Sequence, residues 1–304
     1  IVIARDVTLH TINEDAYGVY AFDGGSASLD DASIDTKGEF AYGVSAVGPG
    51  SHVSIDGGSV TTSGRTANGI DAYLGGTVTA NNVAVTTHGE SSFAMFAFGA
   101  GSRIDAEGVT VVTDGKRADG ALATPAAQVP LLNASVPTRG ELAAGTAAVG
   151  ADSLVEGDNV KVAVSGAGDV TGAAAVSGGT VRISNGSRIE STGVSPFSHA
   201  VSAITNHANM PGATCEATDS TLISAHGLGV AVNGGATARL TNTTVEAGRN
   251  AVGFGAPPAP FDRPSTISIS GGSLHSAEAT VGAVSGRGTV TLSNGVQISS
   301  DNGV

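Results

Sequence analysis

The chain of 304 residues has no tryptophan and a single cysteine, Cys215. One cysteine excludes a disulfide framework within the chain, although a long exported protein with a large core does not need one. No apolar run reaches the roughly 18 residues of a membrane-spanning helix. No signal peptide is visible at Ile1, and the chain starts and stops within its repeating pattern. We therefore expect a fragment of a longer protein.

Charged residues are also few, at 13%, and basic ones are scarcest: 14 Lys and Arg stand against 27 Asp and Glu, for a net charge of -13. The basic residues are scattered, whereas nucleic-acid binding needs a basic face, so no nucleic-acid partner is expected. An anionic membrane would repel the chain as well. Glycine shows no three-residue period, which excludes collagen, and the 40% apolar content argues against wholesale disorder.

What the sequence does contain is a repeat. A glycine closes a short strand-and-threonine unit at a nearly constant interval, at positions 38, 64, 89, 115, 140, 166 and 193, with steps of 25 to 27 residues. Two other elements keep this phase: a strand that begins with a small residue, as in Gly43-Val-Ser-Ala46, and a turn followed by a strand, as in Gly76-Thr-Val-Thr79. Three short strands per 25 or 26 residues are typical of one coil of a parallel β-helix.

We therefore predict an all-β fold, a right-handed parallel β-helix that spans residues 1–304 as one domain. Roughly eleven coils at a spacing of ~4.8 Å give a rod about 50 Å long. A sandwich or barrel would not keep three strand types in a fixed order for so many cycles. One inward column contains Val53, Val78, Val181, Ile267 and Val290. Cys215 falls in this column, which predicts a buried core residue rather than a reactive thiol.

The repeat also carries a family resemblance. Its coils follow the pattern G-V-x-A, G-G-T-V-x-I and G-S-V-x-T-x-G, most clearly at Gly43-Val-Ser-Ala46 with Gly58-Ser-Val-Thr-Thr-Ser-Gly64, and at residues 177–186. These coils resemble the passenger domains of pertactin-like autotransporters, nearest to the serum-resistance and adhesin passengers. The resemblance covers essentially the whole chain and is specific for the architecture.

The resemblance implies a non-enzymatic virulence factor at the bacterial cell surface (outer membrane) or secreted. Export would use a C-terminal β-barrel translocator, which, like the signal peptide, is not in this chain. The implied partner is a host extracellular protein: a complement-control protein such as C1 inhibitor, or a matrix or receptor protein. The chain departs from adhesins that carry an Arg-Gly-Asp triplet, since it has Arg139-Gly-Glu141 and Arg287-Gly-Thr289 instead. Integrin-type adhesion is therefore unsupported.

Two other functions stay open. Parallel β-helices include polysaccharide-degrading enzymes, which need acidic residues clustered on one sheet face. The candidates Asp23, Asp30, Asp31, Asp105 and Glu107 are interpreted as solvated acids, in turns or single on strands. A cleft lined by three or more carboxylates would favour an enzyme, and a flat neutral sheet would exclude one. The third alternative is a purely structural stalk.

We expect no catalytic residues, no metal and no cofactor. The seven histidines have no helical metal spacing, and the DGG segments at 23–25 and 56–58 lack the rest of the calcium-binding repeat. No G-x-S-x-G motif and no phosphate-binding loop are present.

Two insertions interrupt the repeat, Asn206–Gly212 and Gly255–Pro264. Both fall at the same corner, and the strands that follow them are two coils apart, so the loops would project from one edge about 10 Å apart. Binding residues concentrate on such loops. The predicted partner-binding residues there are Asn206, His207, Met210, Pro258, Phe261 and Arg263. The alternative, two tolerated surface insertions, fits the sequence equally well.

The second predicted surface is aromatic. Aligned coils place Phe22, Tyr73 and Phe98 in one column, with Phe96 in a neighbouring column beside Tyr20. If the residues between them point inward, these rings form an exposed apolar stripe, which marks an interaction site. The alternative is that a bulge shifts the parity and the rings fill the core. The sequence slightly favours this alternative, because strand parity is easily lost.

Overall fold

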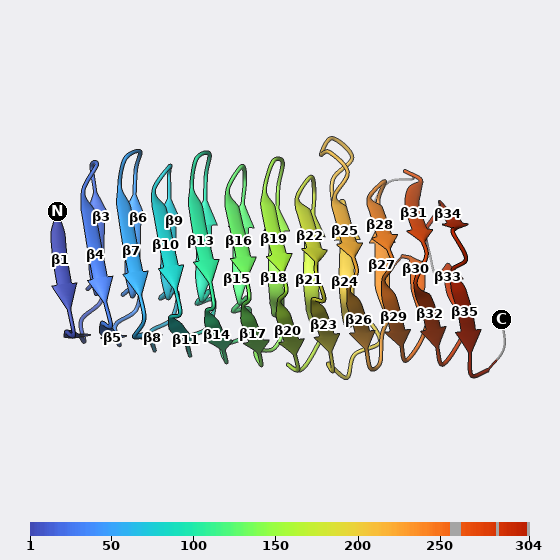
Figure 1. Ribbon diagram of the computed structural model, residues 1–304, viewed down its shortest axis with the longest axis horizontal. Coiled ribbons are helices and arrows are strands. Elements are labelled where there is room, and N and C mark those ends of the chain that lie inside the picture. The colour runs from blue at the N-terminus through green and yellow to red at the C-terminus, as the bar shows by residue number, and fades with distance from the viewer. Residues whose placement is uncertain (256–262, 284–285, 303–304) are drawn as a thin grey trace.

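The computed structural model describes residues 1–255, 263–283 and 286–302. These residues form strands and turns only, so they contain no helix that could cross a membrane. The strands build three parallel sheets of twelve, twelve and eleven strands, here named sheets A, B and C. Each coil contributes one strand to each sheet, and the coils lie side by side along the rod from the N-terminus to the C-terminus (Figure 1). The predicted parallel β-helix is confirmed, with eleven coils of three strands followed by a last pair, β34 and β35.

Sheet A consists of β1 (Val2–Arg5), β4 (Ser26–Asp30), β7 (His52–Asp56), β10 (Thr77–Asn81), β13 (Arg103–Glu107), β16 (Gln128–Leu132), β19 (Leu154–Asp158), β22 (Thr180–Ser184), β25 (Thr214–Thr218), β28 (Thr237–Thr241), β31 (Ser265–Ser270) and β34 (Gly288–Ser293). Sheet B consists of β2 (Thr8–Thr11), β5 (Ser33–Thr36), β8 (Ser59–Thr62), β11 (Ala84–Thr87), β14 (Thr110–Thr113), β17 (Ser135–Thr138), β20 (Lys161–Val164), β23 (Arg188–Ser191), β26 (Thr221–Ser224), β29 (Thr244–Ala247), β32 (Ser273–Ser276) and β35 (Gln297–Ser300). Sheet C consists of β3 (Val19–Phe22), β6 (Val44–Val47), β9 (Ile70–Tyr73), β12 (Met95–Phe98), β15 (Ala121–Thr124), β18 (Ala144–Val149), β21 (Thr171–Val176), β24 (His199–Ile204), β27 (Val230–Asn233), β30 (Val252–Phe254) and β33 (Val281–Ala283).

The core is a set of apolar columns inside the coils. In sheet A, Val53 pairs with Val78 and Val78 with Ile104, and all three are fully buried. Cys215 occupies the predicted column, between Val181 and Ala238, and is fully buried. Burial raises the pKa of its thiol to about 12, because the thiolate would lose its hydration. The predicted role of Cys215 as a core residue is therefore confirmed.

The corner between sheets A and B explains the repeated Asn, Asp and Gly. The residue after each sheet A strand adopts a positive φ, for example 48° at Asp31, 54° at Asn82 and 52° at Asn133. Only glycine, asparagine and aspartate enter this left-handed region at little cost. The turn residues of the repeat are thus selected by backbone conformation.

The corner between sheets B and C explains the threonine and glycine of the repeat. The hydroxyl of Thr36 donates to the carbonyl of Ala41 at 2.6 Å, and Thr62 repeats this bond to Ala67 at 2.6 Å in the next coil. The glycine lies between, where a side chain would point at the backbone of the neighbouring coil. A Cβ on Gly115 would lie 1.8 Å from the carbonyl oxygen of Gly89, and the glycines at 64, 89, 140 and 166 have the same 1.8 Å contact with the glycine one coil earlier. No side chain fits in this column.

We expect Gly115→Ala to lower the free energy of unfolding by about 3 kcal/mol, the upper end of the range for overpacked sites. The clashing atom is backbone, so relief requires two coils to separate. Gly24→Ala is the matched control, since a Cβ there meets no atom within 4 Å and only the φ of +74° is unfavourable. That strain costs about 1 kcal/mol. Urea denaturation followed by circular dichroism measures both, and equal losses would contradict the steric account.

Candidate functional site

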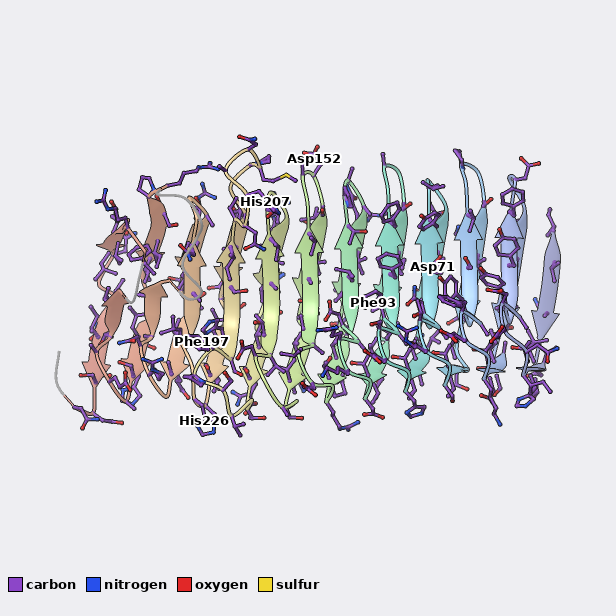
Figure 2. All side chains as sticks on the ribbon, turned by 180° about the vertical axis from the view of Figure 1, so that it is seen from behind. Asp71, Phe93, Asp152, Phe197, His207 and His226 are labelled. Atoms are coloured by element: carbon purple, nitrogen blue, oxygen red, sulfur yellow. The ribbon has the colours of Figure 1, made fainter. Side chains whose placement is uncertain are left out.

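The first insertion lies at the predicted corner, between a sheet C strand and a sheet A strand, and the described residues Gly255 and Arg263 of the second flank the same corner two coils later. The first joins β24 to β25, and Asn206, His207 and Met210 are all exposed on it. In Figure 1 this loop projects beyond the row of turns at its edge, and Figure 2 labels His207, which belongs to it. The predicted residues Pro258 and Phe261 lie outside the described residues.

Arg263 connects the two insertions. Its Nη1 donates to the carbonyl oxygen of Met210 at 2.9 Å and approaches that of Ala208 at 3.5 Å. The side chain crosses the intervening coil over Gly235, where a Cβ would lie 2.9 Å from its Nε. The structure thus brings Arg263 and Met210 together, and the first loop is held by a contact from the second.

The aromatic residues point outward, so the preference for rings in the core is wrong. Val44, Ile70 and Met95 fill the inward positions and are fully buried. The strands β3, β6, β9 and β12 pair in continuous register, and no bulge changes the parity between them. Tyr20 and Phe22 are 50% and 58% exposed. The predicted residues Tyr73, Phe96 and Phe98 lie on the same face and are half-buried.

These rings belong to a larger aromatic face on the outside of sheet C. Its members are Tyr17, Tyr20, Phe22, Tyr42, Tyr73, Phe93, Phe96 and Phe98. Tyr73 stacks on Phe98 with ring centroids 4.8 Å apart, and Tyr17 meets Tyr42 edge-on at 5.1 Å. The sequence analysis missed Tyr17, Tyr42 and Phe93. They share one column just before the sheet C strands, and their positions at multiples of the coil length were the available signal.

Asp71 lies among these rings, on the outward side of β9, although it is only 2% exposed. Its Oδ2 accepts a hydrogen bond from the Ser45 hydroxyl at 3.2 Å, and its Oδ1 accepts one from Asn68 Nδ2 at 3.2 Å. Burial raises the pKa of the carboxyl to about 7, against the smaller opposing effect of the two hydrogen bonds. Figure 2 labels Asp71 on the face of sheet C that is seen from behind.

A recess of about 280 Å³ opens above Asp71. Its lining residues are Tyr17, Tyr20, Tyr42, Ser45, Val47, Asp71, Tyr73 and Phe96. Burial, followed by the neighbouring Asp71 carboxyl, raises the pKa of Tyr42 to about 12, and burial also raises that of Tyr17. The recess therefore combines neutral phenol rings with one buried acid. Sequence reasoning did not single out Asp71. The feature that could have identified it is a charged residue at the coil position that Tyr20, Ser45 and Phe96 occupy in the neighbouring coils.

The outward face of sheet A carries a groove of about 640 Å³. Five carboxylates line it: Asp105, Glu107, Glu156, Asp158 and Glu216. The interpretation of Asp105 and Glu107 as single acids on strands is therefore wrong, because stacking of β13, β19 and β25 gathers acids from distant parts of the sequence. The other candidates, Asp23, Asp30 and Asp31, are exposed and line no part of this groove.

Arginines pair with several of these acids. Arg182 Nη1 lies 3.1 Å from Glu156 Oε1 and its Nε lies 2.9 Å from Glu216 Oε2, and these bonds raise the pKa of the guanidinium. Arg239 contacts the other oxygen of Glu216 at 3.1 Å, which extends the ladder of alternating charge along sheet A. The lining contains no histidine and no aromatic side chain. Within the part of the chain that the structure describes, no three His, Cys, Asp or Glu are arranged to hold a metal.

The raised pKa of Asp71 predicts how stability depends on pH. Its ordinary value is 3.8, so between about pH 4 and pH 7 the folded state holds a proton that the unfolded chain has released. The free energy of unfolding should therefore fall as pH rises through this window, by up to about 1.4 kcal/mol per pH unit and roughly 4 kcal/mol in total. Asp71→Asn should remove this share.

The measurement is the difference between parent and Asp71→Asn in urea denaturation at pH 5 and pH 8. Burial also raises the pKa of Asp119 to about 7, so both proteins keep a slope from that group and only the difference is informative. Asp23→Asn, at an exposed turn, is the control and should follow the parent. Equal slopes in parent and Asp71→Asn would show that Asp71 does not hold the proton.

Comparison with known proteins gives the fold and little more. No known protein family and no curated protein matches the sequence. Among solved structures, a chain in the cryo-EM structure of the Vag8–C1 inhibitor complex is similar, with a TM-score of 0.51, 14% identity, and coverage of 98% of this chain and 88% of that chain. The A-module of the mannuronan C-5 epimerase AlgE4 from Azotobacter vinelandii has a TM-score of 0.51 and 13% identity, covering 92% of this chain and 91% of its own. One of these similar chains occurs in a protein complex and the other is an epimerase, so the fold is compatible with binding and with catalysis.

Proposed function

We propose that the chain is the passenger of a pertactin-like autotransporter, a surface-exposed or secreted bacterial virulence factor that binds a host extracellular protein and performs no chemistry. The observation that carries this proposal is the aromatic face. Tyr20 and Phe22 are each about half exposed on a rigid sheet and stack with ring centroids 5.9 Å apart. Aromatic rings are enriched at the centres of protein interfaces, where they contribute most of the binding energy.

The first insertion loop, together with Arg263, offers a second contact surface at the corner. The Arg263 bond to Met210 fixes the first loop before any partner arrives, which lowers the entropy lost on binding. The loops follow sheet C strands of the eighth and tenth coils, whereas the aromatic face covers the first four. At ~4.8 Å per coil the two surfaces are roughly 30 Å apart along the rod, which is within the reach of one large protein partner.

Two lines support a host complement-control protein as the partner. The repeat resembles those of serum-resistance passengers, and a chain of this fold occurs in the Vag8–C1 inhibitor complex. C1 inhibitor is accordingly the first candidate, with complement evasion as the consequence and the outer membrane or the medium as the location. A matrix or receptor protein, and therefore adhesion, is the second possibility within the same class.

We expect a pull-down from human serum to retain one host protein on the parent chain. The double variant Tyr20→Ser/Phe22→Ser should lower its recovery at least about 10-fold, since hot-spot residues of this kind dominate interface energy. Phe197→Ser is the matched control, because Phe197 is an exposed ring away from the aromatic face. Unchanged recovery with the double variant but loss with Arg263→Ala would move the site to the corner loops. No serum protein retained by the parent would contradict a serum partner.

A polysaccharide-acting enzyme is the second candidate, and the sheet A groove is the observation that favours it. The groove meets the criterion of three or more clustered carboxylates, and Glu107 and Asp158 make no ion pair within the described residues. Arg103 pairs with Asp105, Arg182 with Glu156 and Glu216, and Arg239 with Glu216, so the groove and its ion-pair partners contain two more carboxylates than arginines. Such a groove repels a polyuronate, so its substrate would be a neutral polysaccharide.

Under the binding proposal, neutral and uronate polysaccharides incubated with the chain should keep their length distribution and NMR spectra. Turnover that is lost at least about 100-fold in Glu107→Gln or Asp158→Asn would replace the binding proposal with an enzyme, because removal of an acid–base group costs that much. Glu39→Gln is the matched control, since Glu39 pairs with Arg65 far from the groove.

A further inference from the structure

All four tyrosines of this chain line one small recess. The sequence contains four tyrosines in 304 residues, and Tyr17, Tyr20, Tyr42 and Tyr73 all face the space above Asp71. They come from three coils, with Phe96 of a fourth coil completing the wall. A passive surface of a chain with 4% aromatic residues has no reason to gather them at one point, so the composition of the recess calls for a ligand.

The floor of the recess is a carboxyl group without a cationic partner. None of the ion pairs among residues 1–255, 263–283 and 286–302 includes Asp71, and its hydrogen-bond donors, Ser45 and Asn68, are neutral. A buried carboxylate without a counter-ion is costly. The acids of sheet A contrast with it, because Arg182 and Arg239 compensate Glu156 and Glu216 there.

The rings form a box around this acid. Tyr17 meets Tyr42 at 90° and Tyr20 at 37°, so the ring planes enclose a space from several directions. The face of an aromatic ring carries partial negative charge and attracts a cation within ~6 Å of its centroid. Ring faces and a carboxylate act together on a cation, and both repel an anion.

We propose that this recess binds the ammonium group of an organic cation, with the Asp71 carboxylate as counter-ion and the four tyrosine rings as a cage. The volume of about 280 Å³ lies just below the ~300–1,000 Å³ of ordinary small-molecule sites, so it holds a head group rather than a whole large ligand. The ammonium group can belong to a free alkylammonium compound or to a lysine side chain of a protein. The recess shares Tyr20, Tyr73 and Phe96 with the aromatic face, but cation binding is measured without a host protein, so the two proposals can fail separately.

Other ligand classes fit less well. A sugar could use the phenol hydroxyls, Ser45 and Asp71 as hydrogen-bonding groups, but it is neutral and would leave the carboxylate without a counter-ion. A metal ion needs three or more ligands, and the recess offers a single carboxylate. An apolar group would leave the Asp71 charge uncompensated.

Binding should be linked to protonation. A cation prefers the ionised carboxylate, so below the Asp71 pKa of about 7 binding must displace a proton and affinity should fall up to about 10-fold per pH unit. The other titratable groups that act on the recess are its tyrosines and Asp15. The pKa values of Tyr17 and Tyr42 are raised, so both stay neutral between pH 6 and pH 8. Asp119 titrates in the same range, and comparison with Asp71→Asn isolates the contribution of Asp71.

The chain supplies its own probe for the test. It has no tryptophan, so its intrinsic fluorescence comes from the four tyrosines, all of which line the recess. We would titrate the chain at pH 8 and constant ionic strength with Nα-acetyl-lysine methylamide and with choline. The corresponding norleucine amide is the neutral control for the lysine compound, and glucose tests a sugar. We expect a saturable fluorescence change with at least one cation, none with the neutral compounds, and weaker binding at pH 6.

Asp71→Asn should weaken cation binding at least about 10-fold, because it removes the charged partner. Circular dichroism confirms that the variant is folded, and Asp152→Asn, at an exposed turn outside the recess and the groove, should bind as the parent does. A response to the lysine compound alone assigns the site to a protein side chain, and a response to choline alone assigns it to a free quaternary amine. No saturable response to either cation, equal binding by parent and Asp71→Asn, or a response to glucose alone would overturn the proposal.

Discussion

The close approach of successive coils is the constraint on which this structure depends. At the glycine column the backbones are so near that a Cβ on Gly115 would lie 1.8 Å from the carbonyl oxygen of Gly89. This contact leaves no freedom for one coil to slip against the next, because every sheet is locked in register at the same time. In-register stacking then forces each position of the repeat into a straight column. Inside the rod the columns become the core, and outside they become lines of like or alternating side chains.

The outer faces of the three sheets carry different kinds of side chain. Sheet B presents mostly Ser, Thr and charged residues to solvent, such as Ser59, Thr61 and Glu190. Sheet A presents Glu156, Arg182, Glu216 and Arg239 in alternation along one column of four coils. Sheet C presents rings, which exclude water from the small residues between them, and a cluster of Leu122, Ala147 and Ala174 continues this apolar lining outside the main core. Asp71 is desolvated by that outer layer, which explains how a residue on the outside of a coil acquires the pKa of a buried acid.

The period, the three strands per coil, the core column with Cys215 and the shared corner of the insertions were all predictable, because they follow from local spacing alone. The outer faces were not. Phe22 and Phe98 point to the core or to the outer face depending on whether a β-bulge is present, and the amino-acid sequence does not show where bulges occur. The acidic groove joins Glu156 to Glu216 across a coil lengthened by insertion, since Arg182 and its partner Glu216 are 34 residues apart rather than 26. Asp71 is desolvated by rings one to two coils away, so the residues next to it in the sequence do not predict its burial.

The contrast between sheets B and C also bears on function. A stalk needs only coils that stack, and sheet B shows that this chain stacks coils well with Ser and Thr on the outside. Stacking of the coils does not require rings such as Tyr20 and Phe22 on sheet C, because smaller residues stack equally well on sheet B. The rings also leave apolar surface in water, which is unfavourable. The same holds for an uncompensated acid beneath them. A feature that costs stability in the isolated rod and is confined to four coils is expected where a partner covers it, which is why the aromatic face, rather than the fold, carries the functional argument.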